Sequence, residues 1–182
     1  MNKFKKTETG LQGMIIFEPT VYADDRGFFL ETYNKKDFES LGFRKEFVQD
    51  NQSHSQKGVL RGLHRQVAHP QGKLVRVLSG EVFDVGVDVR KESETFGRWF
   101  GIILSSENKK SLYIPEGFLH GFLVLSQEAE FAYKCTDYYY SEDEDGILWN
   151  DPEIGIKWPL DLVGQPILSQ KDKNLKSLNL IQ

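Results

Sequence analysis

The sequence predicts an all-β domain, built as a barrel or a sandwich of short strands. Many short runs alternate apolar and polar side chains, which is the two-residue period of a half-buried strand. The 182 residues include 13 Phe, 7 Tyr and 16 Gly, a composition that favours strands joined by turns. Patterns with helical spacing are scarce. The length suits one domain with its own core, which we expect to span residues 1–182.

The clearest strand signal lies in residues 73–90. Alternation on either side of the Ser79-Gly80 pair predicts a β-hairpin that turns at this pair. One face of the second strand is predominantly apolar and carries Phe83, Val85, Val87 and Val89; the other face is more polar. Further strands are expected at residues 14–17, 27–33, 47–53, 59–66, 99–104, 111–114, 121–125 and 131–136.

Two short helices are expected at the periphery. Residues 34–42 begin with Asn34, a good N-cap, and end with Gly42, which favours the position just after a helix. Near the C-terminus, the tetrapeptide SQKD (169–172) has the pattern of a capping box. Many short strands with few helices indicate a sandwich or a barrel, and inward side chains of such barrels can meet a ligand.

Charge and composition exclude several classes of function. The net charge of -4 gives no general nucleic-acid surface, although a few placed Arg and Lys would still bind a nucleotide-bearing small molecule. Cys135 is the only cysteine, so no intramolecular disulfide forms, which fits a reducing cytoplasm. The N-terminal residues lack the apolar run of a signal peptide, and no stretch reaches the ~20 apolar residues of a membrane span. We therefore expect a cytoplasmic protein with no membrane partner.

The segment VLRGLH (59–64) places His64 on an expected strand. A lone histidine is commonly an ordinary half-buried residue, but imidazole is also the side chain best suited to proton transfer near neutral pH. Arg61 and His64 are three residues apart, so a regular strand would point them to opposite faces. Gly62 must supply a bulge if both side chains are to meet one ligand.

His120 lies in IPEGFLHGF (114–122), where a proline and two glycines indicate a strand boundary. The pattern PxGxxH is half of a metal-binding signature whose other half is a His-x-His pair followed by Glu. Here His64 is followed by Arg65 and Gln66, so that pair is absent. Two histidines alone make a poor transition-metal site, and we expect no catalytic metal.

Two further residues have both a structural and a catalytic interpretation. Tyr133, on the same strand face as Phe131 and Cys135, is either a core tyrosine or a general acid that gives a proton to a carbanion. Asp172 is either the last residue of the capping box or a buried carboxylate that orients a histidine and stabilises its protonated form.

Two motifs contain residues suited to a nucleotide. DDRGFF (24–29) places Arg26 beside a glycine and aromatic residues ahead of Glu31, and FVQDNQS (47–53) places Gln49 and Asn51 on alternate strand positions. Arginine suits a diphosphate, and amide and aromatic side chains suit a base and a ribose. In isolation, the same motifs would be an exposed salt-bridged turn and a polar strand face.

Together, these motifs resemble those of the dTDP-4-dehydrorhamnose 3,5-epimerases, a branch of the cupin superfamily. The resemblance runs in family order from near residue 10 to residue 172 and so covers nearly the whole chain. It is carried by DDRGFF (24–29), FVQDNQS (47–53), VLRGLH (59–64), QGKLVRV (71–77), DVGVDVR (84–90), IPEGFLHGF (114–122), YKCTDYY (133–139), GILWNDP (146–152) and SQKD (169–172).

The resemblance implies a cupin jelly roll that forms a homodimer and needs no metal or coenzyme. Its substrate would be a dTDP-4-keto-6-deoxy sugar, epimerised at C3 and C5 in deoxysugar (rhamnose) synthesis. His64 would be the base, Asp172 its partner and Tyr133 the acid. The absence of a GxGxxG fingerprint agrees with a reaction in which no hydride moves.

The same resemblance implies the residues that bind the substrate. Lys73 and Arg61 would lie near the sugar O4 and the phosphates, and His120 would line the site. The nucleotide-binding positions would be Arg26, Glu31, Gln49, Asn51 and Lys171. Arg26 would reach across the dimer.

Three positions depart from the family pattern. Arg65 replaces a common aromatic residue and should point away from His64, Leu119 replaces a usual alanine and would narrow the pocket, and Gly86 replaces another alanine. The alternatives are a mono-epimerase acting at C3 or C5, a ketoisomerase, and a non-catalytic module that binds sugar nucleotides. Such a module would not need His64, Tyr133 and Asp172 together. A metal-dependent oxygenase is disfavoured by the missing His-x-His pair.

Overall fold

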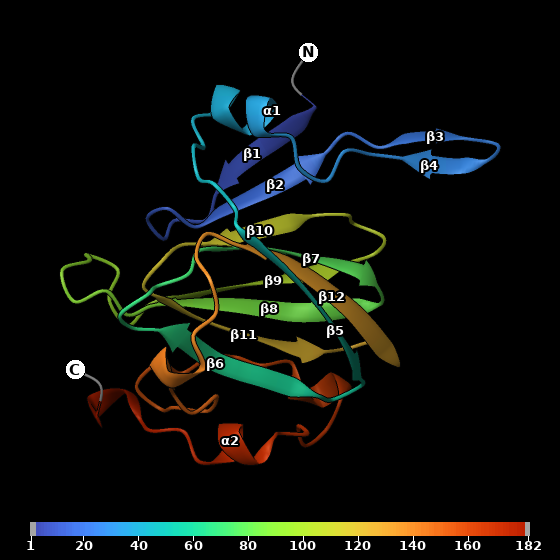
Figure 1. The fold of residues 1–182 in the computed structure, drawn as a ribbon. Coiled ribbons are helices and arrows are strands. Elements are labelled where there is room, and N and C mark those ends of the chain that lie inside the picture. Colours follow the sequence, from blue (N-terminus) through green and yellow to red (C-terminus); the bar gives the residue numbers. More distant parts are fainter. Residues whose placement is uncertain (1–2, 181–182) are drawn as a thin grey trace.

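The computed structural model describes residues 3–180 and consists of two antiparallel sheets that face each other (Figure 1). One sheet has six strands in the order β1-β2-β10-β7-β12-β5, and the other has five in the order β13-β6-β11-β8-β9. A separate hairpin, β3-β4, projects from the body of the protein (Figure 1). This two-sheet barrel confirms the predicted all-β class.

The six-stranded sheet contains β1 (Phe4–Glu8), β2 (Ile15–Pro19), β10 (Ser111–Ile114), β7 (Lys73–Ser79), β12 (Glu128–Cys135) and β5 (Gln49–Gln56). The five-stranded sheet contains β13 (Glu144–Gly146), β6 (Leu60–Gln66), β11 (Phe118–Val124), β8 (Glu81–Asp88) and β9 (Trp99–Ser105). The hairpin is β3 (Tyr22–Asp24) and β4 (Gly27–Phe29). The helices are α1 (Lys35–Ser40), α2 (Gln170–Lys173) and the 3-10 turns Ser141–Asp143, Leu160–Leu162 and Leu178–Leu180.

Both expected helices are present and begin at the expected caps. The Asn34 side chain accepts hydrogen bonds from the backbone at the start of α1, and Gly42 follows the helix with a φ of +79°. The buried face of α1 carries Phe38, whose ring stacks on Phe17 at 4.2 Å. Ser169 caps α2 through its side chain. No helix among residues 3–180 is long and apolar enough to cross a membrane.

The predicted hairpin across Ser79-Gly80 is wrong. Strand β7 pairs with β10 and β12, whereas β8 pairs with β11 and β9, so the turn carries the chain from one sheet to the other. Gly80 has a φ of +79°, and a Cβ at this position would overlap the carbonyl oxygen of Glu128. Local alternation identifies two strands and a turn, but pairing partners depend on distant segments.

Other differences lie at strand boundaries. Strands β1, β3 and β13 were not expected; the first has few apolar residues, and the others have three residues each. The expected strand at 27–33 ends at Phe29, where the chain leaves the hairpin toward α1. The remaining expected strands are present with ends shifted by at most a few residues.

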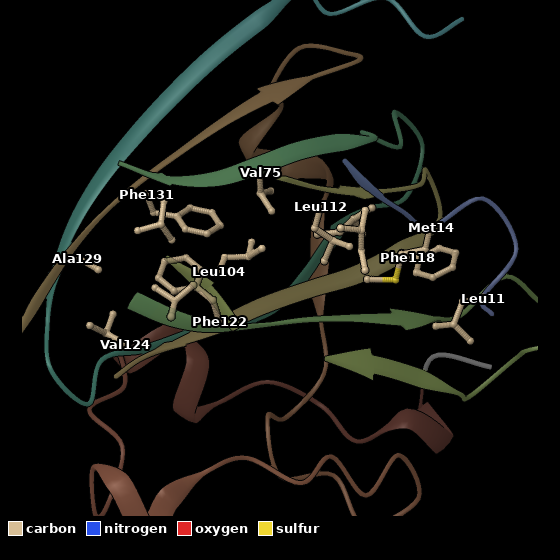
Figure 2. Close-up of a cluster of buried hydrophobic side chains, with 14 residues drawn as sticks. Leu11, Met14, Val75, Leu104, Leu112, Phe118, Phe122, Val124, Ala129 and Phe131 are labelled. Carbon is tan, nitrogen blue, oxygen red and sulfur yellow. The ribbon is translucent and has the colours of Figure 1, made fainter. Parts of the chain in front are cut away.

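The barrel interior is filled by apolar side chains from both sheets (Figure 2). Phe131 and Phe122, from β12 and β11, stack with ring centroids 4.3 Å apart. Met14 lies against Gly86, where a Cβ would come within 2.6 Å of the methionine Cε, so the glycine leaves the space that Met14 fills.

A second apolar core lies between the outer face of the five-stranded sheet and the C-terminal segment, residues 147–178. Strand β8 is therefore buried on both faces: Val82 packs inside the barrel, whereas Val85 and Val87 face the C-terminal segment. The face with a more polar sequence is buried as well, since Asp84 and Asp88 are 0% exposed. The C-terminal segment is tied to the sheet by backbone pairing of residues 59–60 with Ile167 and of Ile147 with Lys176.

Candidate active site

A cavity of about 620 Å³ lies between the sheets and the C-terminal segment. The five-stranded sheet contributes Arg61, His64 and His120, and the six-stranded sheet contributes Lys73 and Tyr133. Lys171 and Asp172 reach it from α2. A smaller cavity of about 270 Å³ shares His64, Lys73 and Tyr133 with the first. Seven of the expected site residues are thus brought together from distant parts of the chain.

Strand β6 carries the bulge that the sequence predicts at Gly62. His64 pairs with His120 of β11, but Arg61 pairs with Phe122, so three steps on β6 match two on β11. Gly62 has a φ of +114°, and a Cβ there would lie 2.6 Å from both the Gly121 Cα and the His120 carbonyl oxygen. The extra residue lets both Arg61 and His64 line the same cavity.

Gly62→Ala is therefore expected to lower the free energy of unfolding by about 3 kcal/mol. A side chain is disfavoured at this positive φ, and the two strand backbones leave no room for it. Urea unfolding followed by circular dichroism measures the effect. Gly97→Ala is the matched control, because Gly97 also has a positive φ but no neighbour within 4 Å of the place that a Cβ would take. An equal loss in both variants would contradict the close-approach explanation.

His64 is bound to the carboxylate of Asp172. The His64 Nε2 lies 2.5 Å from Asp172 Oδ1, and Asp172 is only 3% exposed. Burial acts to raise the pKa of Asp172, but the hydrogen bond from His64 and that from Ser169 hold it below its ordinary value. With Asp172 ionised, Nε2–H donates to it and the lone pair of Nδ1 remains free to take a proton.

Asp172 makes contacts that belong to each of its two interpretations. Its backbone N–H donates to the Ser169 hydroxyl at 3.1 Å, as at the start of a capped helix. Its carboxylate, however, binds His64. The helix cap therefore fixes the backbone of Asp172 and leaves the side chain to orient the imidazole.

Tyr133 and Lys73 stand next to each other on neighbouring strands. The Lys73 Nζ lies 5.9 Å from the centroid of the Tyr133 ring. Burial lowers the pKa of Lys73 and raises that of Tyr133, and for Tyr133 the nearby Cys135 adds to the increase while Arg61 opposes it. Among the described residues, no carboxylate forms an ion pair with Lys73. The cation is thus available to a negative charge on a ligand.

His120 is paired with a carboxylate that the sequence analysis did not select. Its Nε2 lies 2.9 Å from Oδ2 of Asp84, which is fully buried on β8. The other oxygen of Asp84 has no hydrogen-bond partner among residues 3–180. Asp84 belongs to the DVGVDVR motif, but as one of three acidic residues in its strand it gave no sign of its partner.

Glu144 is a second residue that the sequence analysis missed. It accepts a hydrogen bond from Tyr139 Oη at 2.9 Å, forms an ion pair with Lys171, and lies 3.7 Å from the His64 Nδ1. It stands in the acidic run 142–145, which looks like a solvated surface segment. Its place just before GILWNDP was the one available signal.

Of the five expected nucleotide-binding residues, Lys171 lines the larger cavity, and the other four fall into two groups. Gln49 and Asn51 line the smaller cavity, where their side chains are joined by a hydrogen bond of 3.1 Å. Arg26 lies on the exposed β3-β4 hairpin and binds Asp24, and Glu31 binds Lys3 and Asn34. Neither Arg26 nor Glu31 lines either cavity of its own chain.

The departures from the family pattern have different consequences. Leu119 is fully buried in the core beneath the C-terminal segment and does not line the cavity, so the expected narrowing of the pocket is wrong. Alternation along β11 turns Leu119 away from the neighbouring His120. Arg65 bonds to Asp145 at 3.5 Å and contributes to the wall of the smaller cavity. No group of three or more metal-ligating side chains is found among residues 3–180.

Comparison with known proteins shows the family to which this chain is related. The family model described as dTDP-4-dehydrorhamnose 3,5-epimerase matches residues 8–179. The protein of that name from Methanothermobacter thermautotrophicus is 55% identical over 178 residues, covering 98% of this chain and 96% of the relative.

Two solved structures show how closely the fold is shared. The dTDP-6-deoxy-D-glucose-3,5-epimerase of Legionella pneumophila, in complex with dTDP-4-keto-L-rhamnose, superposes with a TM-score of 0.94 at 55% identity and covers 98% of this chain and 95% of its own. A 3′-monoepimerase from Streptomyces bikiniensis, in complex with dTDP-quinovose, gives 0.87 at 32% identity, with 93% and 86% covered. The predicted cupin jelly roll is thereby confirmed, and the chain belongs to the dTDP-4-dehydrorhamnose 3,5-epimerase family.

Proposed function

We propose that this chain converts dTDP-4-dehydro-6-deoxy-D-glucose to dTDP-4-dehydro-L-rhamnose by moving protons at C3 and C5. The observation that carries the proposal is one cavity in which a His–Asp pair, a tyrosine and a lysine without a carboxylate partner among residues 3–180 meet. The matching Legionella structure holds dTDP-4-keto-L-rhamnose. The family relationship supplies the substrate class, and the cavity supplies the groups that the chemistry requires.

The chemistry follows from the ketone at C4. The C–H bonds at C3 and C5 are acidic because loss of either proton gives an enolate with its charge on O4. Inversion of a centre needs a base on one face of the sugar ring and a proton donor on the other. His64 comes from the five-stranded sheet and Tyr133 from the six-stranded sheet, and both line the cavity, which supports their acting on opposite faces of the sugar ring.

In this proposal each residue has one task. His64, oriented by Asp172, removes the proton with Nδ1, and Tyr133 returns a proton to the opposite face. General acid–base help of this kind contributes about 10²–10⁴-fold. Lys73 faces the enolate oxygen and stabilises its charge. The carbon centres keep their oxidation state through both steps, so the reaction needs no redox coenzyme, and in this proposal Lys73 stabilises the enolate charge in place of a metal ion.

The nucleotide end is assigned to the polar residues around the same cavities. Arg61 and Lys171 supply cations for the diphosphate, Gln49 and Asn51 line the smaller cavity, and His120 lines the sugar end. Arg26 and Glu31 would complete the site from a second copy of the chain in a homodimer.

The hairpin that carries Arg26 supports this dimer. Phe28 and Phe29, on β4, are 60% and 65% exposed, and they stand on an element that projects from the body of the protein (Figure 1). Neighbouring exposed aromatic rings are typical of a surface that another chain covers. A cytoplasmic location completes the proposal and suits the lone, buried Cys135.

The proposal is tested by NMR in D₂O with dTDP-4-dehydro-6-deoxy-D-glucose, following C3 and C5 separately. The chain is expected to exchange and invert both centres. Inversion at one centre alone would identify a mono-epimerase, as the Streptomyces bikiniensis protein is named. Failure to exchange either centre would reject the proposed reaction.

Tyr133→Phe is expected to impair epimerisation while deuterium still enters at C3 or C5. The variant lacks the acid, but His64 can remove a proton and solvent can return deuterium on the same face. The same NMR assay separates exchange from inversion, and calorimetric titration with dTDP verifies that the site is intact. Loss of exchange together with loss of dTDP binding would make Tyr133 a structural residue instead.

A further inference from the structure

Two carboxylates flank the imidazole of His64, and the catalytic proposal above uses only one. Asp172 binds Nε2, while Oε1 of Glu144 lies 3.7 Å from Nδ1 on the opposite edge of the ring. We propose that Glu144 is a positioning residue for the base, a second carboxylate that attracts the proton which Nδ1 takes from the sugar. This inference rests on the proposed role of His64.

The backbone brings Glu144 to this place independently of the ligand. Strand β13 pairs with β6 in a register that sets Glu144 opposite Gln66 and Gly146 opposite His64. The carboxylate is then held from two further sides, by the Tyr139 hydroxyl at 2.9 Å and by Lys171. Its position is therefore determined by contacts from three separate segments of the chain.

Glu144 carries a negative charge at neutral pH. Burial acts to raise its pKa, but the contacts from Lys171 and Tyr139, with His64 nearby, hold the pKa below the ordinary value. The distance of 3.7 Å from Nδ1 is too long for a hydrogen bond to the neutral ring. It is short enough for the carboxylate to favour a positive charge on that ring.

The effect of Glu144 thus changes during the reaction. Before proton transfer, the neutral ring lies near the carboxylate without a hydrogen bond to it. When the C–H bond breaks, its electron pair moves into the enolate and its proton joins Nδ1, so the positive charge of the imidazolium now lies near Glu144. The carboxylate stabilises this state more than the one before it, which is the condition for an effect on rate. The other charged or titratable side chains around His64 in the cavity are Arg61, Lys73, His120, Tyr133, Tyr139 and Lys171.

A purely structural role would give Glu144 a different signature. If it served only to hold Lys171 for the diphosphate, its loss would weaken substrate binding and leave the chemical step unchanged. Glu144→Gln and Lys171→Met separate the two roles. Glutamine keeps the shape of the carboxylate and can accept from Tyr139, whereas methionine removes only the cation of Lys171.

The experiment measures kcat and KM in D₂O, the rate of deuterium entry at saturating substrate, and the Kd of dTDP for both variants. Glu144→Gln is expected to lower kcat and the exchange rate about tenfold, the scale of one neighbouring charge, with the Kd of dTDP unchanged. Lys171→Met is expected to raise KM and the Kd of dTDP about tenfold with little change in the exchange rate. A Glu144→Gln variant that reproduces the Lys171→Met pattern would overturn the inference.

Glu144→Asp tests the charge should the glutamine variant fold poorly. It keeps the carboxylate on a shorter side chain and is expected to retain more of the exchange rate than Glu144→Gln. An equal loss of exchange rate in both variants would mean that the charge of Glu144 is not what matters. The same would follow if the glutamine variant is unfolded and the aspartate variant loses its exchange rate. If the unsubstituted chain exchanges neither C3 nor C5, the proposed function fails and the inference falls with it. Exchange by the unsubstituted chain with an unchanged rate in Glu144→Gln rejects Glu144 alone.

Discussion

His64→Asn is expected to lower the turnover of dTDP-4-dehydro-6-deoxy-D-glucose by at least about 10²–10⁴-fold, the contribution of a general base alone. Asparagine has no group that accepts a proton from carbon near neutral pH. Its amide reaches only as far as the imidazole Nδ1, so Asp172 loses the Nε2 donor that now lies 2.5 Å away. Circular dichroism therefore has to verify that the variant is folded, because an unpaired buried charge destabilises a fold.

The control for this variant is nucleotide binding. The dTDP moiety contacts other residues in the proposal, so calorimetric titration with dTDP should give a Kd close to that of the unsubstituted chain. Deuterium exchange at C3 and C5 should be lost together with turnover. Full activity of His64→Asn would refute the assignment of the base, whichever residues line the cavity.

Lys73→Met is expected to lower kcat by about 10²–10³-fold, the cost of removing one preorganised donor from an oxyanion. Methionine preserves most of the aliphatic volume, so the change removes the charge rather than the packing. Within the described part of the chain, the ammonium has no carboxylate partner, and it stands beside Tyr133, where the enolate oxygen is expected to form. Steady-state kinetics at saturating substrate measure the effect, and an unchanged kcat would remove Lys73 from the mechanism.

The pH dependence provides a check on the same residue. Because burial lowers the pKa of Lys73, its charged form is lost at a lower pH than for an ordinary lysine, and activity should fall as pH rises through that value. Burial raises the pKa of Tyr133, so its proton is lost at a higher pH than that of an ordinary tyrosine. Lys73→Arg should move the alkaline limb of the kcat profile to higher pH, since arginine stays protonated. An alkaline limb that stays in place would assign it to another group.

Local patterns predict the elements of this fold better than their connections. The alternation in residues 73–90 correctly indicates two strands and a turn, yet β7 and β8 belong to different sheets. A two-residue period is the same whichever neighbour a strand pairs with. The apolar face of β8 was correctly identified, but it packs against the C-terminal segment instead of the barrel interior, because a strand buried on both faces carries no sign of which face is central.

For a similar reason, only part of the candidate site could be predicted from the sequence. Residues in distinctive motifs, such as His64 and Tyr133, could be selected from the sequence, and the bulge at Gly62 followed from the spacing of Arg61 and His64. The carboxylates Glu144 and Asp84 could not, because each reaches its histidine through the pairing of separate strands. Sequence motifs select the candidate site residues, whereas strand pairing determines which carboxylates lie beside them.

The segment that covers the outer face of the five-stranded sheet, residues 147–178, also contains Asp172, the partner of the imidazole. In the proposed mechanism, catalysis therefore requires that this segment, which is synthesised late, has emerged from the ribosome and docked on the sheet. Until then, the imidazole has no Asp172 carboxylate to set its tautomer. Proteolytic cleavage that released this segment would expose the outer apolar face of the five-stranded sheet and would also remove Asp172 from His64. Damaged or unfinished chains would thus be inactive on the sugar nucleotide and would not convert it partially.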